Sequence, residues 1–360
     1  MAKSNIIDLS KFTFTAEQIR DIRDLVFDEV LKAPELNELH EMFSGIVYDK
    51  EIGFITGGGL VGKAAQGCNP EAQDFKIGTR KVVWQPKTWE VIIDECATDL
   101  DNTCAVYCKN LGVRANDLTD TDYMAIVVQV LTDAIKKMLY RIIWLSDTDA
   151  TNVSDEDTPG LITDGVDVEY FNLIDGLFKQ LQTAATAHPE LLVTISANSK
   201  TTKATQMSGM TAEVAYQLLN DMYYKAPVVM RASGKMRFLV TQTIADAYQQ
   251  YLTGKNIEST YKNLVDGVRS LKFLGVDVIP MPVWDEQIQA YFDQGSTKGY
   301  YKPHRAVLIE KANTAVGTPS DGVLEEVDVF YDKKSRINRM EASDKIDAKL
   351  LNDTRFVLGI

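Results

Sequence analysis

The sequence predicts an α+β fold, and three features of its pattern support that prediction. Residues 120–145 hold apolar side chains at helical spacing without a glycine or proline, which predicts a long amphipathic helix. Residues 46–55 and 81–93 are strand-like runs on either side of a glycine-rich segment. Beyond residue 190, short predicted strands alternate with predicted helices. The chain has 360 residues, 45% of them hydrophobic, which is enough for two or three folded units.

The N-terminal segment is predicted to hold one helix behind an arm. Thr15 and Gln18 form a capping-box pattern, in which the two side chains bind free backbone N–H groups at a helix start. Apolar residues then recur at helical spacing until Pro34. Residues 1–14 are interpreted as an arm that is free or docked on a partner.

Two long strands joined by a flexible excursion are predicted next. The run from Ile46 to Ile55 ends in Thr56 and three glycines, and residues 57–78 are polar with further glycines. Strand-like runs return at 81–84 and 89–93. Connecting segments of this length are usually functional or mobile, so the excursion is a candidate contact surface.

The predicted helix over 120–145 is the clearest element of the chain. At 1.5 Å per residue it would span roughly 39 Å, which suits the backbone of a domain. Later elements follow from shorter patterns: helices at 172–183, 211–224 and 243–253, and strands at 191–195, 238–240, 276–279, 327–330 and 356–358. Residues 200–272 carry ten basic and five acidic side chains in a chain of net charge −13, which predicts a separately charged surface.

Composition argues against several classes of protein. A net charge of −13 disfavours a protein whose main task is to grip nucleic acid, because phosphate binding needs clustered Lys and Arg. No apolar stretch approaches the roughly 18 residues of a membrane-spanning helix, and the first residues lack an apolar signal core. Four cysteines are too few for a disulfide scaffold. We therefore expect an acidic, globular protein in a reducing cytoplasm.

The segment Gly57–Lys63 matches two phosphate-binding signatures, the P-loop and the dinucleotide loop. Both require a helix after the loop, because the helix N-terminus holds the phosphates. Here Gly67 and Pro70 interrupt any such helix, and Ala64 stands where a P-loop has the Ser or Thr that binds Mg²⁺. No acid stands about 20 residues on, where a dinucleotide site holds the ribose. A nucleotide-binding enzyme therefore stays only as an alternative from a different class.

No other motif predicts nucleophilic catalysis or a zinc site. Cys104 and Cys108 would share a helix face, but a zinc site needs two more ligands and Cys96 is the only nearby candidate. Buried, inert thiols are the preferred interpretation. The nucleophile elbow G-x-S-x-G does not occur. The chain has three histidines, which are isolated from one another: His40, His188 and His304.

The acidic run over 147–157 is the remaining candidate for a cation. Its Asp and Glu residues offer the oxygen ligands that Ca²⁺ prefers. The run lacks the glycine at the turn and the spaced glutamate of an EF-hand loop, so a solvated, self-repelling loop is the preferred interpretation. No metal and no cofactor is predicted.

The order of these elements resembles the major capsid protein of tailed bacteriophages, the Hong Kong 97-type fold, over nearly the whole chain. The order of the elements carries the resemblance, together with the segments Asp175–Phe178 and Leu271–Val278, which are similar to segments of that family. It implies an N-terminal arm at 1–43, an extended β-hairpin loop at 44–95 and a peripheral domain with a long spine helix at 96–200. An axial domain at 201–304 and peripheral return strands at 305–360 would follow.

The resemblance implies a virion structural protein without catalysis, which self-assembles into the icosahedral shell of a double-stranded DNA phage. Its expected partners are copies of itself in pentamers and hexamers, scaffolding, portal and decoration proteins, and packaged DNA by weak non-specific contact. Assembly is expected in the host cytoplasm, without a membrane. An encapsulin-type shell is the close alternative. The candidate inter-subunit contact residues are Gly57, Gly58, Gly59, Gly62, Lys63, Arg80 and Lys81.

Overall fold

The computed structural model describes residues 36–58, 76–96, 122–153, 161–255, 271–295, 298–319, 328–332, 334–335 and 337–360. In these ranges the strands form three sheets and helices pack on two of them, so the predicted α+β class is confirmed. The predicted helix at 15–34, the segment 59–75, Cys104 and Cys108 lie outside the described residues. No described helix combines the length and the apolar character that a membrane crossing requires.

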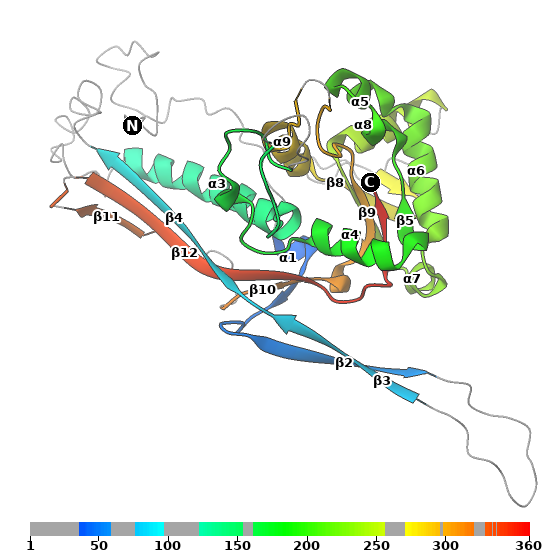
Figure 1. Ribbon diagram of the computed structural model, residues 1–360, viewed down its shortest axis with the longest axis horizontal. Helices are drawn as coiled ribbons and strands as arrows, with labels where there is room; N and C mark the ends of the chain where they lie inside the picture. The colour runs from blue at the N-terminus through cyan, green and yellow to red at the C-terminus, as the bar shows by residue number, and fades with distance from the viewer. Residues whose placement is uncertain are drawn as a thin grey trace, which may run out of the picture.

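One sheet has five strands and forms the long side of the molecule (Figure 1). Its longest strand, β12, pairs with β4 and β11 along its first part and with β10 along its second part, and β10 pairs with β1. The pairing of β12 with β4 is antiparallel, from Ile337↔Cys96 to Ile346↔Lys87. The strands are β1 (Glu41–Phe43), β4 (Lys87–Cys96), β10 (Thr314–Gly317), β11 (Asp328–Asp332) and β12 (Ile337–Leu350).

The helix α3 (Asp122–Leu145) lies along one face of this sheet and confirms the helix predicted at 120–145. Its 24 residues span about 36 Å at 1.5 Å per residue. Side chains on a strand alternate between its two faces, so every second residue of β12 is available to the helix. The buried residues of α3 and β12 belong to one apolar core: Ile135, Leu139, Ile142, Ile143, Met340, Ala342, Ile346 and Ala348.

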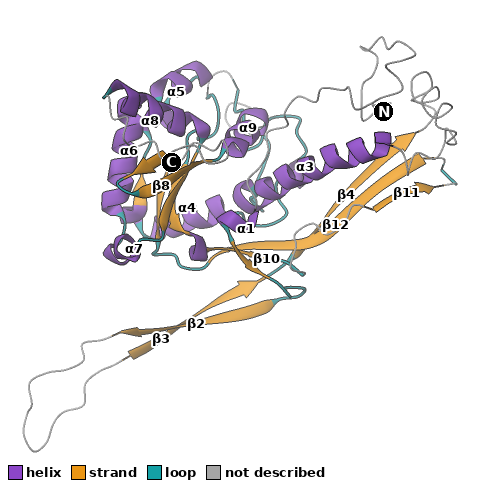
Figure 2. Cartoon of the chain, turned by 180° about the vertical axis from the view of Figure 1, so that it is seen from behind, coloured by secondary structure: helices purple, strands orange, loops and turns teal. Residues whose placement is uncertain are grey.

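The second unit is a six-stranded sheet of order β5-β13-β9-β6-β8-β7, with helices on both of its faces (Figure 2). Its central strand β9 contributes Ala306 and Leu308 to one core and Val307 and Ile309 to the other. All five residues of β9 are buried, as in strands covered on both faces. The strands are β5 (Leu192–Val193), β6 (Met236–Val240), β7 (Leu271–Phe273), β8 (Val276–Pro280), β9 (Ala306–Glu310) and β13 (Phe356–Gly359).

The described helices other than α3 belong mainly to this second unit. The amphipathic helices α6 and α8 cover the core that contains Leu308, whereas α4 and α9 join the core of α3. Thr211 starts α6 as its N-cap, because its hydroxyl accepts a hydrogen bond from Val214 N–H. Their bounds are α1 (Leu36–Leu39), α4 (Leu177–Ala187), α5 (Lys203–Gly209), α6 (Ala212–Lys225), α7 (Val228–Ser233), α8 (Gln242–Gly254) and α9 (Pro282–Tyr291).

The C-terminal range 305–360, which the resemblance assigns to peripheral return strands, contributes to both sheets. β9 pairs with β6 and with β13, so the beginning and the end of this range lie in the six-stranded sheet. Between them the chain forms β10, β11 and β12 of the long sheet. The last strand therefore returns to the six-stranded sheet.

Most predicted elements are present with shifted ends. The strand predicted at 46–55 begins at Lys50, and Ile46 lies before it, buried in a cluster with Trp84. The helix predicted at 172–183 begins at Leu177, after Gly176 as its N-cap. A Cβ at Gly176 would lie 2.9 Å from the carbonyl oxygen of Ser146, so this approach requires glycine.

The turn between β7 and β8 yields a testable prediction. Leu274 and Gly275 have φ values of 46° and 83°, as both central residues of a type I′ turn require, and a leucine at positive φ is strained. Because Asn tolerates this conformation, Leu274→Asn is expected to raise the free energy of unfolding by about 1 kcal/mol, measured by chemical denaturation. Gly275→Ala should lower it. An unchanged or lowered value for Leu274→Asn would contradict the assignment of strain.

Candidate assembly surfaces

A two-stranded hairpin extends away from both units (Figures 1 and 2). Its strands, β2 (Lys50–Gly58) and β3 (Lys76–Trp84), pair antiparallel from Lys50↔Trp84 to Gly58↔Lys76. Nine residues at roughly 3.3 Å each make the paired part about 30 Å long. Among the described residues no third strand pairs with it. Because an isolated two-stranded sheet is marginally stable in water, contact with another protein surface would stabilise this hairpin.

The base of the hairpin is fixed to the body by a small apolar cluster around Trp84, which is fully buried. The ring of Phe43 lies 5.6 Å from the Trp84 ring, centroid to centroid. A Cβ at Gly317 would lie 2.8 Å from two carbons of the Trp84 ring, so the ring packs directly on the backbone of β10. The other buried members of the cluster are Ile46, Ala315 and Leu351.

Beyond its base, the hairpin presents charged and apolar side chains to solvent. Ile77 is 63% exposed. Arg80 Nη1 lies 2.8 Å from Asp353 Oδ1, and Lys81 Nζ lies 2.8 Å from Glu51 Oε1. Exposed ion pairs of this kind contribute little to stability, so they leave these basic groups available to a partner.

The structure describes four of the seven candidate contact residues and brings all four onto this hairpin. Gly57 and Gly58 end β2, opposite Ile77 and Lys76. Arg80 and Lys81 lie in β3. The remaining three candidates lie outside the described residues: Gly59, Gly62 and Lys63. Their role in contacts stays a prediction.

The hairpin also bears on the nucleotide-binding alternative. A phosphate-binding loop of either type follows a strand of a parallel sheet and precedes a helix. Here β2 is antiparallel to β3, and within the described residues it joins no parallel sheet. This setting disfavours a nucleotide site that begins at Gly57.

The long sheet has an open face opposite α3. Ile92 of β4 is 54% exposed on it, and Phe330 of β11 is 41% exposed. Arg339 of β12 is in register with Phe330 on one side and with Asp94 on the other. Its Nε and Nη2 donate to the two carboxylate oxygens of Asp94 at 2.7 and 3.2 Å. Exposed apolar side chains on the open face of a sheet are typical of an interaction surface.

Sequence reasoning missed this open face because no local pattern assigned a strand to 337–350, and the resemblance implied return strands over 305–360 without their bounds. The strand carries most of its charged residues on one side, and Asp344 interrupts the small and apolar residues of the other, which weakens its overall hydrophobic signal. The signal that could have found it is the period-two spacing of Met340, Ala342, Ile346 and Ala348, all of which are buried.

The second unit has an exposed apolar group of its own, at the end of α6 and in α7. Tyr224 is 61% exposed, Val228 is 69% exposed and Val229 is 60% exposed. Neighbouring valines on a short helix have no local reason to face water. This group is a further candidate contact surface.

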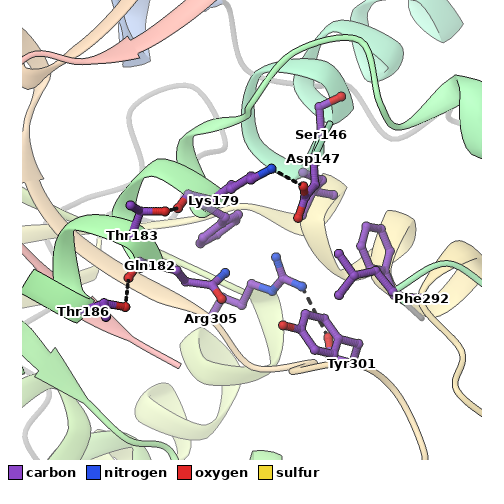
Figure 3. A pocket seen from close by; sticks show the side chains of 12 residues that line it. Ser146, Asp147, Lys179, Gln182, Thr183, Thr186, Phe292, Tyr301 and Arg305 are labelled. Atoms are coloured by element: carbon purple, nitrogen blue, oxygen red, sulfur yellow. Dashed lines mark hydrogen bonds and ion pairs between the residues drawn. The ribbon is translucent and has the colours of Figure 1, made fainter. Parts of the chain in front are cut away.

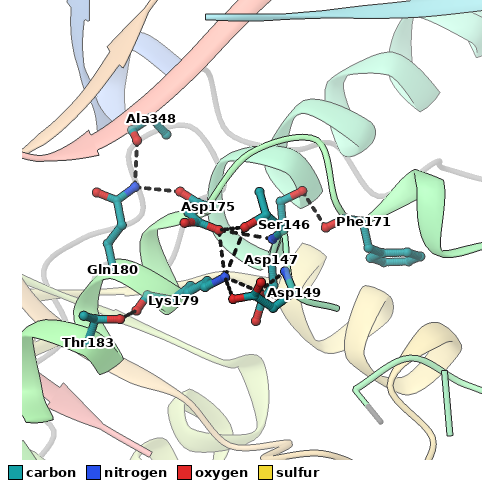
Figure 4. Close-up of polar contacts among 10 residues, drawn as sticks. Ser146, Asp147, Asp149, Phe171, Asp175, Lys179, Gln180, Thr183 and Ala348 are labelled. Atoms are coloured by element: carbon teal, nitrogen blue, oxygen red, sulfur yellow. Dashed lines mark hydrogen bonds and ion pairs between the residues drawn. The ribbon is translucent and has the colours of Figure 1, made fainter. Parts of the chain in front are cut away.

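Two residues of the acidic run 147–157 are ion-paired rather than self-repelling. Lys179 Nζ lies 2.6 Å from Asp147 Oδ1 at the edge of a pocket (Figure 3). It also lies 2.7 Å from Asp149 Oδ2 and 2.9 Å from Asp175 Oδ1 (Figure 4). Burial opposes the charge of Lys179, but hydrogen bonds to the three carboxylates raise its pKa. Within the described ranges, no three His, Cys, Asp or Glu side chains form a group that could hold a metal ion.

Comparison with known proteins finds similarity at the level of structure. No family model matches the chain, and no curated protein matches it. One similar structure is the capsid of a native GTA particle, with 10% identity over 93% of this chain and 94% of that chain and a TM-score of 0.47.

Two further solved structures show the same degree of similarity. A structure from Mycobacterium phage Ogopogo has 9% identity, covers 97% of this chain and 99% of that chain, and has a TM-score of 0.49. The holo-SrpI encapsulin complex from Synechococcus elongatus has 10% identity, 92% and 91% coverage, and a TM-score of 0.46.

Proposed function

We propose that this chain is the major capsid protein of a tailed double-stranded DNA bacteriophage, a structural subunit that assembles with its own copies into pentamers, hexamers and an icosahedral shell. The observation that carries the proposal is the hairpin β2–β3, which extends from the body, pairs with no third strand among the described residues and exposes Ile77. Within the described part of a single copy, the hairpin has no surface to lie on. In a shell, a neighbouring copy supplies that surface.

The open face of the long sheet is the surface that we assign to a neighbour's hairpin. The strands of the hairpin hold four basic residues and one acid, whereas the open face of β4, β11 and β12 carries five acids and two basic residues. Opposite charge steers the encounter of two such surfaces. The exposed side chains of Ile92 and Phe330 would then be buried against Ile77. A contact between two different surfaces of one chain is head-to-tail, and it closes into rings when its rotation allows.

The remaining partners belong to the same proposal. Scaffolding, portal and decoration proteins would bind the assembled subunits, and the shell would form in the host cytoplasm and persist in the virion. The net charge of −13 fits a wall that contacts packaged DNA weakly, because phosphates bind clustered Lys and Arg. An encapsulin-type shell is the alternative. The contents of purified particles distinguish the two: DNA supports the capsid and a cargo enzyme supports the encapsulin.

Replacing Ile77 by aspartate is expected to block assembly without unfolding the subunit. The substitution places a charge on an exposed hairpin position that assembly would bury. Size-exclusion chromatography followed by negative-stain microscopy measures closed particles, rings or tubes, and circular dichroism reports the fold. Gly53→Ala is the matched control on the same hairpin, because a Cβ there meets nothing within 4 Å.

Two outcomes would contradict the assembly role of the hairpin. One is an Ile77→Asp chain that assembles as fully as the wild type. The other is a wild-type chain that stays a 40.2 kDa monomer under every assembly condition, with scaffold included. Nucleotide binding by such a monomer, lost in Lys63→Ala, would favour the enzyme instead.

A further inference from the structure

A pocket of about 240 Å³ lies between α4, the residues 145–147 at the end of α3, and the segment 292–305 (Figure 3). Since a water occupies about 30 Å³ of liquid, the pocket has room for several waters or one small organic group. The side chains of Phe178 and Arg305 are buried in its wall, and the exposed Thr183 and Thr186 stand on its rim. The pocket is therefore open to solvent on one side and closed on the other.

Arg305 is 2% exposed, yet within the described ranges no carboxylate lies at ion-pair distance from it. Its guanidinium lies 4.7 Å from the ring centre of Phe178, 5.6 Å from that of Phe292 and 5.9 Å from that of Tyr301. Such cation–π contacts stabilise a guanidinium but do not neutralise it. Burial lowers the pKa of Arg305 to about 10, so the group is still a cation at neutral pH.

Only part of the hydrogen-bonding capacity of Arg305 is used. Its Nε donates to the carbonyl oxygen of Lys302 at 3.1 Å, and its Nη2 donates to that of Tyr301 at 3.3 Å. A guanidinium has five N–H donors in a planar fork. Three of the five, including both on Nη1, therefore have no acceptor among the described residues.

Two neutral side chains add donors beside the guanidinium. Lys302 Nζ donates to Gln182 Oε1 at 3.2 Å, which leaves the Nε2 amide of Gln182 as a free donor at the pocket. Tyr301 also lines the pocket, and its hydroxyl has no acceptor in the described part of the chain. The only acid in the lining, Asp147, is bound to Lys179 at 2.6 Å. Two cations at the pocket, Arg305 and the half-buried Lys302, have no carboxylate partner within the described ranges.

The geometry points to a carboxylate-binding site in this pocket, with Arg305 as its charged anchor and Gln182 and Tyr301 as further donors. A carboxylate is planar and matches the fork of a guanidinium with two parallel hydrogen bonds. A buried charge without a counter-ion is costly, and a bound carboxylate removes that cost. Asp147, Asp149 and Asp175 outnumber Lys179, with which they pair, so their net negative charge beside the pocket disfavours the second charge of a phosphate.

The carboxylate has two sources that the same site would accept. One is a free small carboxylate in solution. The other is an Asp or Glu side chain of a second copy of this chain, presented when subunits assemble. Binding of a free carboxylate does not depend on the proposed function, whereas binding of a side chain from a second copy rests on it.

Acetate is the probe that tests the site directly. The full-length, unassembled chain is titrated with sodium acetate at constant ionic strength, with sodium chloride as the balance, at neutral pH. We expect a saturable rise in the midpoint of thermal unfolding, because a ligand that binds only the folded state stabilises it by mass action. Sodium phosphate at the same ionic strength should give a smaller rise.

Variants at the pocket separate a site from a general salt effect. Arg305→Met should abolish the acetate response. Since Arg305 is buried and its loss affects folding, Gln182→Ala is the second variant. It should lower the affinity for acetate about tenfold, because one hydrogen bond is lost. Thr186→Val is the matched control on the rim, because the Thr186 hydroxyl already donates to the carbonyl of Gln182. It should leave the response unchanged.

The same titration on assembled particles identifies the source of the carboxylate. A free ligand predicts equal acetate binding to assembled and unassembled chains. A carboxylate from a second copy predicts that acetate lowers the assembled fraction in sedimentation velocity and does not bind intact particles. Either result supports the site. A folded, unassembled chain without a saturable acetate response, or a response that Gln182→Ala leaves unchanged, would overturn it, whether or not the chain assembles.

Discussion

Replacing Trp84 by alanine is expected to detach hairpin β2–β3 from the body and to abolish assembly. The indole is fully buried where the hairpin meets β10, and its removal leaves a cavity between Phe43 and Gly317. Removing a buried tryptophan costs about 3–5 kcal/mol of the free energy of unfolding. Urea denaturation measures that loss, and negative-stain microscopy of the folded variant measures assembly.

An aromatic residue at the same end of the hairpin provides the matched control. Tyr48 is 78% exposed, and its ring contacts Lys345 Nζ at 5.0 Å from its centre. Tyr48→Ala should change the free energy of unfolding by less than about 1 kcal/mol, because exposed side chains contribute little. Equal losses for Trp84→Ala and Tyr48→Ala would contradict the anchoring role of the buried ring.

A second substitution reaches the same anchor without removing the ring. A Cβ at Gly317 would overlap the indole of Trp84, and overpacking of this kind costs about 1–3 kcal/mol. Gly317→Ala should therefore impair assembly in the same way as Trp84→Ala, whereas Gly53→Ala on the open part of the hairpin should not. Assembly of Gly317→Ala at wild-type yield would show that the position of the ring is not required.

The elements that sequence predicted best are those whose own pattern decides their structure. The apolar spacing of α3 continues over many turns without a breaker, and the helix it predicts ends at Leu145 as expected. The strands on either side of the glycine-rich segment could be predicted as a pair, because no other apolar run lies between them. In both cases the signal is local, because the pattern that predicts the element lies in the residues that form it.

Sheet membership and the candidate sites depend on distant residues, so the sequence alone could not provide them. Nothing local shows that β9 pairs with β6 and β13 while β10 joins a different sheet. Gly317 is one of 22 glycines, and only the position of Trp84 shows that a side chain there would clash. Arg305 likewise follows a histidine without any motif, and its lack of a counter-ion is visible only after α4 packs beside it.

The free energy of unfolding is expected to fall on acidification because of His40. This residue is fully buried, and Trp144 Nε1 donates to its Nε2 at 3.2 Å, so the neutral ring carries its proton on Nδ1. That Nδ1 is buried without a hydrogen-bond partner. Burial, and then the charges of Arg237 and Lys311, lower the pKa of His40 to about 3.

The sign of this effect follows from the two pKa values. The ordinary pKa of histidine is 6.5, so below that pH the unfolded chain binds a proton that the folded chain does not bind. The free energy of unfolding therefore decreases as pH falls from about 6.5 toward about 3. At about 1.4 kcal/mol per unit, the loss from this residue reaches about 4–5 kcal/mol.

The test compares the wild type with His40→Gln across pH by urea denaturation. The amide oxygen of glutamine can still accept the Trp144 N–H, and the variant cannot titrate. Burial raises the pKa of Asp285 to about 6, which makes the folded state more stable as pH falls, but Asp285 is present in both proteins and cancels in the difference. We expect the wild type to be the more stable protein at pH 7 and to lose that advantage below about pH 5. A difference that stays constant from pH 7 to pH 4 would show that His40 is protonated in the folded chain as readily as in the unfolded one.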